Sequence, residues 1–172
     1  TLSCIRAWMY YNKYITKRRT LMPNWCHNRI TIYGDSETES KLKEIEETFK
    51  KVDPFNQIFP IPDFKTIPND KGELPVLEQK LNPDGSIFYE TYNFPDGTND
   101  DRWYMWCVNN WGTKWDAGDV DIEYQDSEIL ELEFDTAWSP PEGIMEKLRE
   151  KYPDLSFQCF YDEPGMEAAG YY

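Results

Sequence analysis

Two short stretches between residues 120 and 135 alternate apolar and polar side chains, a pattern that suits an antiparallel sheet with one solvated face. In Val120–Gln125 and again in Leu130–Asp135, every second residue is apolar and most of the others are acidic. Successive side chains of a strand point to opposite faces of its sheet, so each stretch predicts a strand that is buried on one side only. The Asp126-Ser127 pair between them predicts the turn that joins the two strands.

Four further elements are predicted around these two strands. Both predicted helices begin with capping signals: a capping-box sequence at Ser36 to Glu39, and Ser139 as an N-cap before two prolines. The predicted elements are a strand at Asn28–Tyr33, a helix at Ser36–Lys51, a helix at Ser139–Tyr152 and a strand at Leu155–Tyr161.

The order strand, helix, strand, strand, helix, strand is that of the split βαβ plan. We therefore predict an α+β fold, a ferredoxin-like split βαβ sandwich with a four-stranded antiparallel sheet and two helices on one face. A mixed αβ sandwich with a different strand order would use the same succession of elements and stays open as the alternative.

A proline-rich segment separates the first predicted helix from the second predicted strand. Residues 54–98 contain seven prolines and several turn pairs, so no long regular element can run through them. We predict an insertion at about 54–117, after the first helix. Within it we expect a short extended piece at Phe55–Ile61, a hairpin that pairs Val76–Gln79 with Ser86–Tyr92, and a helix at Asp101–Trp111.

The chain of 172 residues contains 32 acidic and 18 basic residues, which gives a formal net charge of -14 at pH 7. Such a charge repels phosphate backbones and anionic lipid surfaces. We therefore expect no direct binding to nucleic acid and no membrane partner. The length suits one domain, and the apolar content is sufficient for a core.

The charge is unevenly distributed along the chain. Residues 1–21 contain five basic residues and no acidic one, and Met22 follows them. We expect residues 1–21 to be a basic N-terminal extension, non-native or translated from upstream sequence, and residues 22–172 to be a single ferredoxin-like domain. Four widely spaced cysteines without a CxxC pair indicate buried free thiols, and the absence of a signal-peptide pattern predicts a cytoplasmic protein.

Ten residues form the candidate ligand-binding set. The most unusual stretch, Trp111–Asp116, places two tryptophans around a glycine and a lone lysine in an acidic chain. Two interpretations are open: a binding surface on which Lys114 pairs with an anion, or indoles that fill the core while Lys114 forms a structural ion pair. The junction near Trp138 is included because loops at strand ends commonly carry sites. The set is Asn24, Trp25, Trp111, Gly112, Thr113, Lys114, Trp115, Asp116, Trp138 and Ser139.

No sequence pattern identifies a reaction. The only histidine, His27, adjoins Cys26, but adjacent cysteine and histidine rarely share a metal and no second histidine is present. The acidic residues of the two alternating strands resemble the paired carboxylates of a hydrolase, yet acids in such positions are normally the solvated face of a sheet. Phosphate-binding loops, dinucleotide fingerprints and nucleophile motifs are missing. We expect no catalytic residue, no metal and no cofactor.

Five long motifs occur in order along the chain. They are Met22 to Cys26 with Asn28, Phe55 to Ile58 with Pro60 and Pro62, Asn110 to Asp116, Thr136 to Pro141, and Tyr161 to Gly170. This series resembles the YubB ferredoxin-like domain family of plasmid, phage and bacterial proteins. The resemblance spans Met22 to about Gly170 and implies the ferredoxin-like plan, with residues 1–21 outside it. It implies no activity, because the family is uncharacterised.

The leading hypothesis is a small acidic, non-enzymatic protein of phage or plasmid type that binds an unidentified protein or small ligand. In one variant, its acidic body mimics nucleic acid and occupies the basic groove of a host protein. The alternative is a small-ligand-binding or hydrolytic domain with a pocket framed by Trp111, Trp115 and Trp138, with Lys114 and Asp116 as polar anchors. A self-associating protein with an exposed apolar patch is a third hypothesis, and the oligomeric state stays open.

Overall fold

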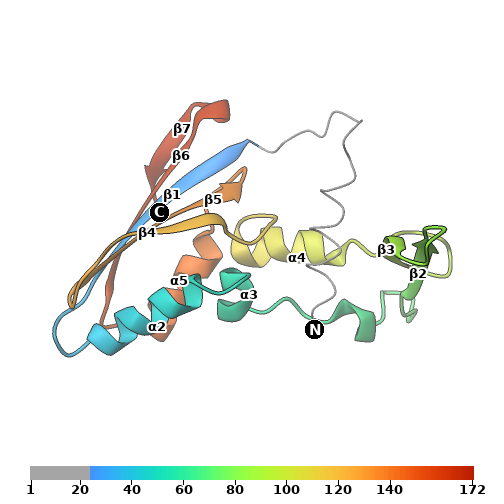
Figure 1. The fold of residues 1–172 in the computed structure, drawn as a ribbon, viewed down its shortest axis with the longest axis horizontal. Helices are drawn as coiled ribbons and strands as arrows, with labels where there is room; N and C mark the ends of the chain where they lie inside the picture. Colours follow the sequence, from blue (N-terminus) through green and yellow to red (C-terminus); the bar gives the residue numbers. More distant parts are fainter. Residues whose placement is uncertain (1–23) are drawn as a thin grey trace. The chain divides into compact units, whose positions relative to one another are not determined.

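The computed structural model of the chain describes residues 24–172, and the predicted extension at residues 1–21 lies outside this range. Its main feature is an antiparallel five-stranded sheet with helices α2 (Glu39–Phe49) and α5 (Glu142–Lys151) on one face (Figure 1). From one edge of this sheet to the other, the strands are β4 (Gly118–Gln125), β5 (Ile129–Ala137), β1 (Trp25–Tyr33), β6 (Ser156–Glu163) and β7 (Ala168–Tyr171).

The topology confirms the ferredoxin-like prediction. The elements β1, α2, β4, β5, α5 and β6 follow one another in the predicted order. In space, β1 lies between β5 and β6 and pairs antiparallel with both, which gives the order β4-β5-β1-β6 of the split βαβ plan. The mixed sandwich with a different strand order is thereby excluded.

The predicted number of strands and helices is wrong. The described residues contain a five-stranded sheet, a separate two-stranded sheet and four α-helices, whereas the predicted sandwich has a four-stranded sheet and two helices, with a hairpin and one further helix in the insertion. The fifth strand, β7, pairs with β6 so that Tyr171 lies opposite Phe160. Its sequence, Ala-Ala-Gly-Tyr, has a single large side chain and therefore lacks the alternation that identifies a strand.

A short helix, α3 (Pro54–Ile58), occupies the region in which the sequence predicts an extended piece at Phe55–Ile61, so that prediction is wrong. The backbone N–H groups of Phe55 and Asn56 donate to the two carboxylate oxygens of Asp116, at 2.8 and 2.9 Å. The first N–H groups of a helix have no partner within it, and an external acceptor stabilises the helix start. Asp116 is 60 residues from Asn56, so no local pattern indicates this helix.

The first long helix begins later than the capping-box sequence predicts. α2 starts at Glu39 and not at Ser36. The Asp35 carboxylate accepts hydrogen bonds from the backbone N–H groups of Glu37 and Thr38, both at 3.0 Å. These bonds close a turn before the helix, which is the local structure that aspartate side chains favour.

The other two helices lie close to their predicted positions. The helix predicted at Asp101–Trp111 is α4 (Arg102–Trp111). α5 begins at Glu142, after the two prolines and three residues later than predicted, and ends at Lys151, one residue before the predicted end at Tyr152. No helix within residues 24–172 combines the length and the apolar character needed to cross a bilayer.

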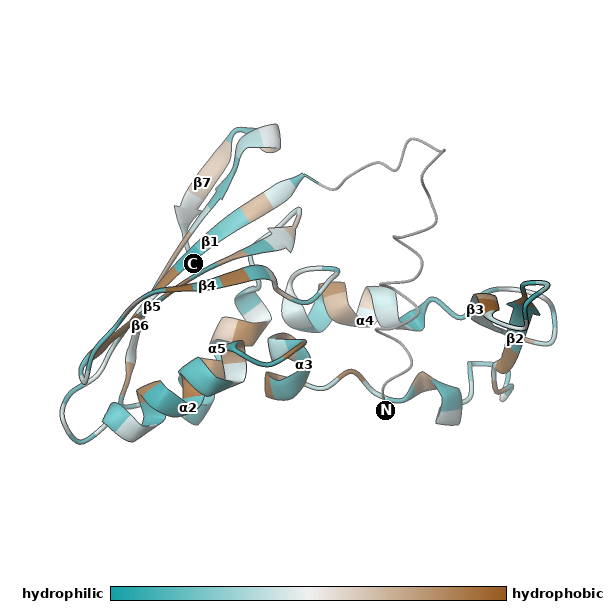
Figure 2. Cartoon of the chain, viewed as in Figure 1, coloured by the Kyte–Doolittle hydropathy of each residue, from teal (hydrophilic) through white to brown (hydrophobic). Residues whose placement is uncertain are grey.

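The core lies on the helix-covered face of the sheet. The buried residues of β1 are Cys26, Asn28, Ile30 and Ile32. Between the sheet and the helices, the rings of Phe49, Phe55 and Phe134 pack together, with centroid separations of 5.6 to 6.5 Å. Burying one such side chain contributes about 2 kcal/mol. Figure 2 shows hydrophobic and hydrophilic residues interleaved along α2, as expected of a helix with one buried side.

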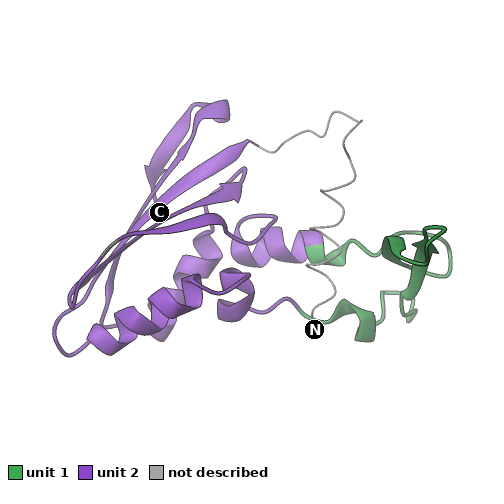
Figure 3. Cartoon of the chain, viewed as in Figure 1, with its two compact units in different colours: residues 1–22, 62–103 green, residues 23–61, 104–172 purple. Residues whose placement is uncertain are grey.

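The described residues divide into two compact units (Figure 3). Residues 62–103 form one unit, and the rest of the described chain forms the other. The insertion predicted at about 54–117 is therefore divided between the two units. Its residues 54–61 and 104–117 belong to the unit of the five-stranded sheet, and its residues 62–103 form the other unit.

The unit of residues 62–103 contains the predicted hairpin. Its elements are a 3₁₀ turn at Phe64–Thr66 and a two-stranded sheet of β2 (Val76–Leu81) and β3 (Ile87–Asn93). The guanidinium of Arg102 donates to three backbone carbonyls within residues 64–68 and pairs with Asp100 at 2.7 Å. A planar guanidinium carries five donors, so this one side chain fixes a segment that has little regular structure.

Three described cysteines are buried free thiols, namely Cys26, Cys107 and Cys159. Burial raises their pKa values to about 11, 12 and 11, respectively. Because the thiolate is the reactive form, we expect these thiols to react slowly in the folded protein at about pH 8 and fully after unfolding in urea. A chromogenic disulfide reagent applied to a Cys4→Ser variant measures both rates, and rapid reaction of the folded variant would contradict the burial.

Candidate functional site

Five side chains from separate parts of the chain gather at one end of the five-stranded sheet. This Trp-Lys cluster consists of Trp25, Tyr104, Lys114, Trp115 and Trp138. Trp115 lies between the other two indoles, with its ring centroid 6.2 Å from that of Trp25 and 6.1 Å from that of Trp138. The structure thus brings together three of the four predicted tryptophans with the predicted lysine.

Lys114 lies at the centre of the cluster. Its Nζ atom is 4.7 Å from the ring centroid of Trp115, 5.1 Å from that of Tyr104 and 5.3 Å from that of Trp138. These separations are within the range of cation–π attraction. Burial lowers the pKa of Lys114. Within residues 24–172 no carboxylate lies within 4.0 Å of its ammonium group, so the structural ion pair considered for it is not formed there.

Trp138 has an unusual backbone conformation. Its φ angle is 69°, in the left-handed region that a bulky residue rarely adopts, at a cost of about 1 to 3 kcal/mol. The residue follows directly on Ala137, the last residue of β5, and its N–H donates to the carbonyl of Asn24 at 2.9 Å. The side chain of Asn24 in turn lies over Gly165. Neighbouring strand ends therefore hold Trp138 in a conformation that it would not adopt alone.

The cluster presents aromatic surface to solvent. Trp25 is 36% exposed and Trp138 is 41% exposed, while Trp115 and Lys114 are half-buried. An indole ring offers a large apolar contact area at little cost in side-chain entropy. The cluster therefore combines exposed rings with a partly desolvated cation.

Trp111 belongs to the core and not to this surface. It is 2% exposed, and its indole N–H donates to the carbonyl of Phe59 at 2.8 Å. Its ring meets those of Phe55 and Trp106 edge to face, each at a centroid separation of 5.9 Å. The core-filling interpretation thus describes Trp111, whereas Trp115 and Trp138 retain the geometry of a binding surface.

Three other residues of the predicted set fix the loop that carries Lys114. The hydroxyl of Thr113, which is buried, donates to the carbonyl of Ala137 at 3.0 Å. The hydroxyl of Ser139 donates to the carbonyl of Gly112 at 2.6 Å. The prediction that Ser139 caps α5 is therefore wrong, because its side chain joins the loop before β4 to the segment after β5.

Asp116 has a structural position within the same loop. Its carboxylate accepts hydrogen bonds from the backbone N–H groups of Phe55, Asn56 and Ala117, at 2.8 to 2.9 Å. Burial raises the pKa of this carboxyl to about 6, although the three N–H groups oppose the shift. A side chain engaged in three backbone hydrogen bonds supports the cluster and does not offer a free anchor.

The outer face of the sheet combines acids with two basic residues. Cys26 is buried, while the next residue, His27, is exposed on the opposite face and pairs with Asp135. Arg29 forms an ion pair with Glu133 beside it. The acids on this face include Asp121, Glu131, Glu133 and Asp135. Within the described residues, no three His, Cys, Asp or Glu side chains converge as metal ligands.

Tyr104 is the member of the cluster that the sequence analysis misses. It lies in the first turn of α4, ten positions before Lys114 in the chain. The two residues meet because the chain turns back at Gly112, whose φ angle is 88°. A glycine after a helix indicates an end of that helix, but it does not show which earlier side chain the loop will reach.

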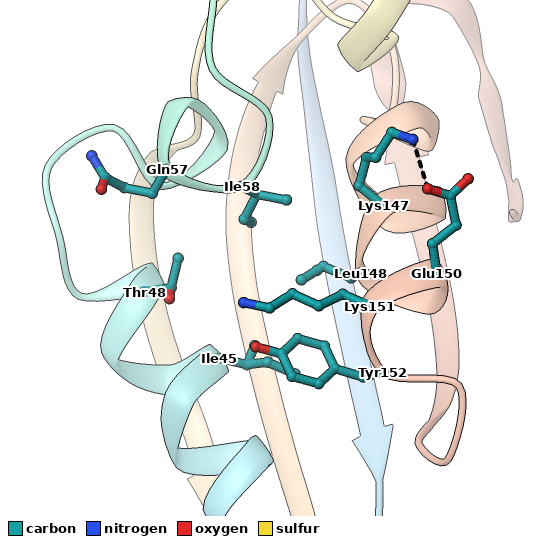
Figure 4. A pocket seen from close by; sticks show the side chains of 9 residues that line it. All are labelled: Ile45, Thr48, Gln57, Ile58, Lys147, Leu148, Glu150, Lys151 and Tyr152. Atoms are coloured by element: carbon teal, nitrogen blue, oxygen red, sulfur yellow. Dashed lines mark hydrogen bonds and ion pairs between the residues drawn. The ribbon is translucent and has the colours of Figure 1, made fainter.

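A cavity of about 330 Å³ lies elsewhere, between α2, α3 and α5 (Figure 4). Its lining includes the apolar side chains of Ile45, Ile58 and Leu148. Its lysines are paired with carboxylates: Lys147 with Glu150 at 2.6 Å, and Lys151 with a glutamate of α2. None of the ten predicted residues lines this cavity, so it is not the pocket that the alternative hypothesis requires.

Residues 110–172 match the family model described as the ferredoxin-like domain in Api92-like protein. No curated protein matches the chain. Among solved structures, the crystal structure of a protein api92 from Yersinia pseudotuberculosis is similar at 12% sequence identity and a TM-score of 0.49, over 87% of this chain and 93% of that one. A ferredoxin-like domain of the Api92-like family is therefore recognised over residues 110–172 of this chain.

Proposed function

We propose that this chain is a small acidic binding protein, and not an enzyme, that recognises a protein partner through the Trp-Lys cluster. The observation that carries the proposal is the exposure of Trp25 and Trp138 around Lys114, whose ammonium group has no carboxylate partner within residues 24–172. Tryptophan and tyrosine dominate the few residues that supply most of the binding energy in protein interfaces. The strained backbone of Trp138 supports the same proposal, since such strain is concentrated at functional sites.

The chemistry of the cluster favours a partner that offers one carboxylate among apolar groups. A partly desolvated ammonium group gains a charge-assisted hydrogen bond when a carboxylate arrives, and the surrounding rings exclude water from that bond. The net charge of -14 repels a partner that is acidic as a whole. The expected partner surface is therefore neutral or basic overall, with a single glutamate, aspartate or chain terminus that reaches Lys114.

We also propose that the chain is a relative of the YubB ferredoxin-like domain family. In this proposal it is a protein of phage or plasmid type that acts in the cytoplasm. The five ordered motifs between Met22 and Gly170 support the kinship. Three buried free thiols suit a reducing compartment.

A second candidate partner site is the outer face of the sheet, on which acids could imitate the phosphates of nucleic acid. Asp121 lies opposite Glu133, and Glu131 and Asp135 lie on the same face. However, Arg29 and His27 interrupt this face, so its negative charge is not continuous. Binding of this kind would weaken steeply as salt rises, because it depends on charge alone.

The test is a set of affinity pull-downs from bacterial lysate with three matched variants. Trp138→Ala and Lys114→Gln are expected to weaken recovery of the partner about thirtyfold, the effect of losing about 2 kcal/mol at the centre of an interface. Lys43→Gln removes an exposed lysine of α2 and is expected to bind as the wild type does. Quantitative mass spectrometry of the eluates gives the ratios.

Equal recovery of one partner by the wild type and by both cluster variants would refute the role of the cluster. If that recovery also falls steeply with salt, the outer face of the sheet becomes the better site. Asp116→Ala is unsuitable as a binding variant, because its carboxylate stabilises the fold through three backbone hydrogen bonds.

A further inference from the structure

The two-stranded sheet of residues 62–103 exposes apolar side chains on both of its faces. The exposed apolar residues of this sheet are Val76, Leu77 and Leu81 on β2 and Ile87, Phe88 and Tyr89 on β3. Figure 2 shows hydrophobic segments on both strands. A two-stranded sheet has marginal stability alone, and exposed apolar surface of this kind marks an interface.

The outer edge of β2 is open within residues 24–172. β2 pairs with β3 alone. The outer edge of β3 is partly occupied, since the N–H of Asp100 donates to the carbonyl of Tyr92 and a bridge joins Asn93 to Asn99. Open edges carry unpaired backbone groups that accept another strand. The edge of β2 is therefore the place at which the sheet can grow.

The sequence of β2 is complementary to itself when it runs antiparallel. Residues 77–81 read Leu-Glu-Gln-Lys-Leu. Read backwards, this sequence keeps a leucine at each end and the glutamine in the middle, while the glutamate and the lysine exchange places. Neither charge has an opposite charge within 4.0 Å in the described residues: the carboxylate of Glu78 accepts from Tyr89 and Asn93, and the ammonium of Lys80 lies 5.7 Å from the ring of Phe88.

We propose that β2 pairs with β2 of a second copy of this chain, antiparallel around Gln79, to form a four-stranded sheet across the interface. In that register Glu78 of each copy faces Lys80 of the other copy, and Leu77 of each copy faces Leu81 of the other copy. Such a contact is isologous, so it closes as a dimer and does not extend into a fibre. The extra residue in the β2–β3 pairing, Phe88, is on β3 and leaves the alternation of β2 uninterrupted.

Other registers are less favourable. A parallel pairing in register places Lys80 against Lys80 and Glu78 against Glu78, and like charges directly opposite each other destabilise a sheet. A shift of the antiparallel pairing by one residue places Leu77 opposite Lys80 or Leu81 opposite Glu78. Within one copy, Leu77 and Leu81 lie opposite Tyr92 and Ile87 of β3. In the proposed register the two leucines of the second copy lie beside them and extend this apolar side of the sheet.

Two single variants test the proposal by complementation. Lys80→Glu and Glu78→Lys each replace two attractive pairs per dimer by two repulsive ones, so each variant alone is expected to dimerise at least about tenfold more weakly than the wild type. An equimolar mixture of the two variants restores both attractive pairs, and is expected to form a heterodimer as strong as the wild-type dimer. Sedimentation velocity over a concentration series measures all three, with the full chain.

Cross-linking provides an independent test of the register. In the proposed dimer Gln79 faces Gln79 of the second copy, so Gln79→Cys in a Cys4→Ser background is expected to form a disulfide-linked dimer on mild oxidation. Thr91→Cys on β3 is the matched control and is expected to cross-link at least about tenfold more slowly, because it does not lie at the axis. A wild type that stays monomeric at every concentration, variants that dimerise like the wild type, a mixture that does not associate, or equal cross-linking of both cysteines would each overturn the proposal.

Discussion

Replacing Asp116 with alanine is expected to lower the free energy of unfolding by about 4 kcal/mol. The buried carboxylate accepts hydrogen bonds from the backbone N–H groups of Phe55, Asn56 and Ala117. In the variant these three donors lose their acceptor inside the protein, and each loss costs about 1 to 3 kcal/mol. Helix α3 also loses the negative group at its N-terminus. Unfolding in urea, followed by tryptophan fluorescence, measures the difference.

An exposed acid of the five-stranded sheet gives the control. Asp162 lies on β6 and is exposed, so Asp162→Ala is expected to change the free energy of unfolding by less than about 1 kcal/mol. A loss in Asp116→Ala no larger than that of Asp162→Ala would contradict the structural role of Asp116 and return it to the set of ligand anchors.

The stability of the wild type is expected to depend on pH through the same carboxyl. Burial raises the pKa of Asp116 from 3.8 to about 6, so the folded protein holds this proton more tightly than the unfolded chain. The stabilisation is fully present below about pH 4 and is lost as the pH rises through about 6, with a total of about 3 kcal/mol. Asp116→Asn cannot titrate.

The informative quantity is the difference in free energy of unfolding between the wild type and Asp116→Asn at each pH. Carboxylates elsewhere in the protein contribute equally to both proteins and cancel in this difference. The advantage of the wild type is expected to shrink by about 2 kcal/mol between about pH 4 and pH 7. A difference that stays constant over this range would show that the carboxyl is not desolvated as the structure has it.

Much of the fold could be predicted because its main elements carry local patterns. The alternation in residues 120–125 and 130–135 and the four-residue repeat of α5 are visible in any short window of the sequence. α3 could not be predicted, since the acceptor at its N-terminus comes from a distant loop. β7 could not be predicted either, because its small residues become a strand only when β6 offers an edge.

The candidate site could be predicted by residue type but not by position. Tryptophan and lysine in an acidic chain are enough to mark Lys114, Trp115 and Trp138 as candidate binding residues. Which indole is buried depends on packing, and Trp111 is buried because α4 places it against Phe55, a residue of another helix. Sequence spacing alone does not distinguish Trp111 from Trp115, although their environments differ completely.

A methyl group added at Gly143 or Gly112 is expected to lower the free energy of unfolding by about 3 kcal/mol or more. A Cβ atom at Gly143, in the first turn of α5, would overlap the backbone carbonyl oxygen of Asn110 near the end of α4. Because both atoms belong to the backbone or are fixed to it, no side-chain rotation relieves the overlap. The Gly143→Ala variant must therefore move α5 away from α4.

Two features of the structure favour glycine at position 112. Its φ angle of 88° is one that an alanine adopts only with strain, and a Cβ there would lie 2.9 Å from the carbonyl oxygen of Pro140. Gly118→Ala is the matched control, since the nearest atom to a Cβ at that position, the carbonyl oxygen of Asp135, is 3.8 Å away. Its effect is expected to stay below about 1 kcal/mol.

The comparison of these three glycine variants shows whether Gly112 is required for the packing of the loop that carries Lys114. If Gly112→Ala and Gly143→Ala unfold at much lower urea concentrations than Gly118→Ala, close packing against the start of α5 determines the conformation of this loop. That packing then places Lys114 and Trp115 beside Trp138. Equal stability of all three variants would contradict the close approach and would leave Gly112 as an open backbone position that a ligand could reach.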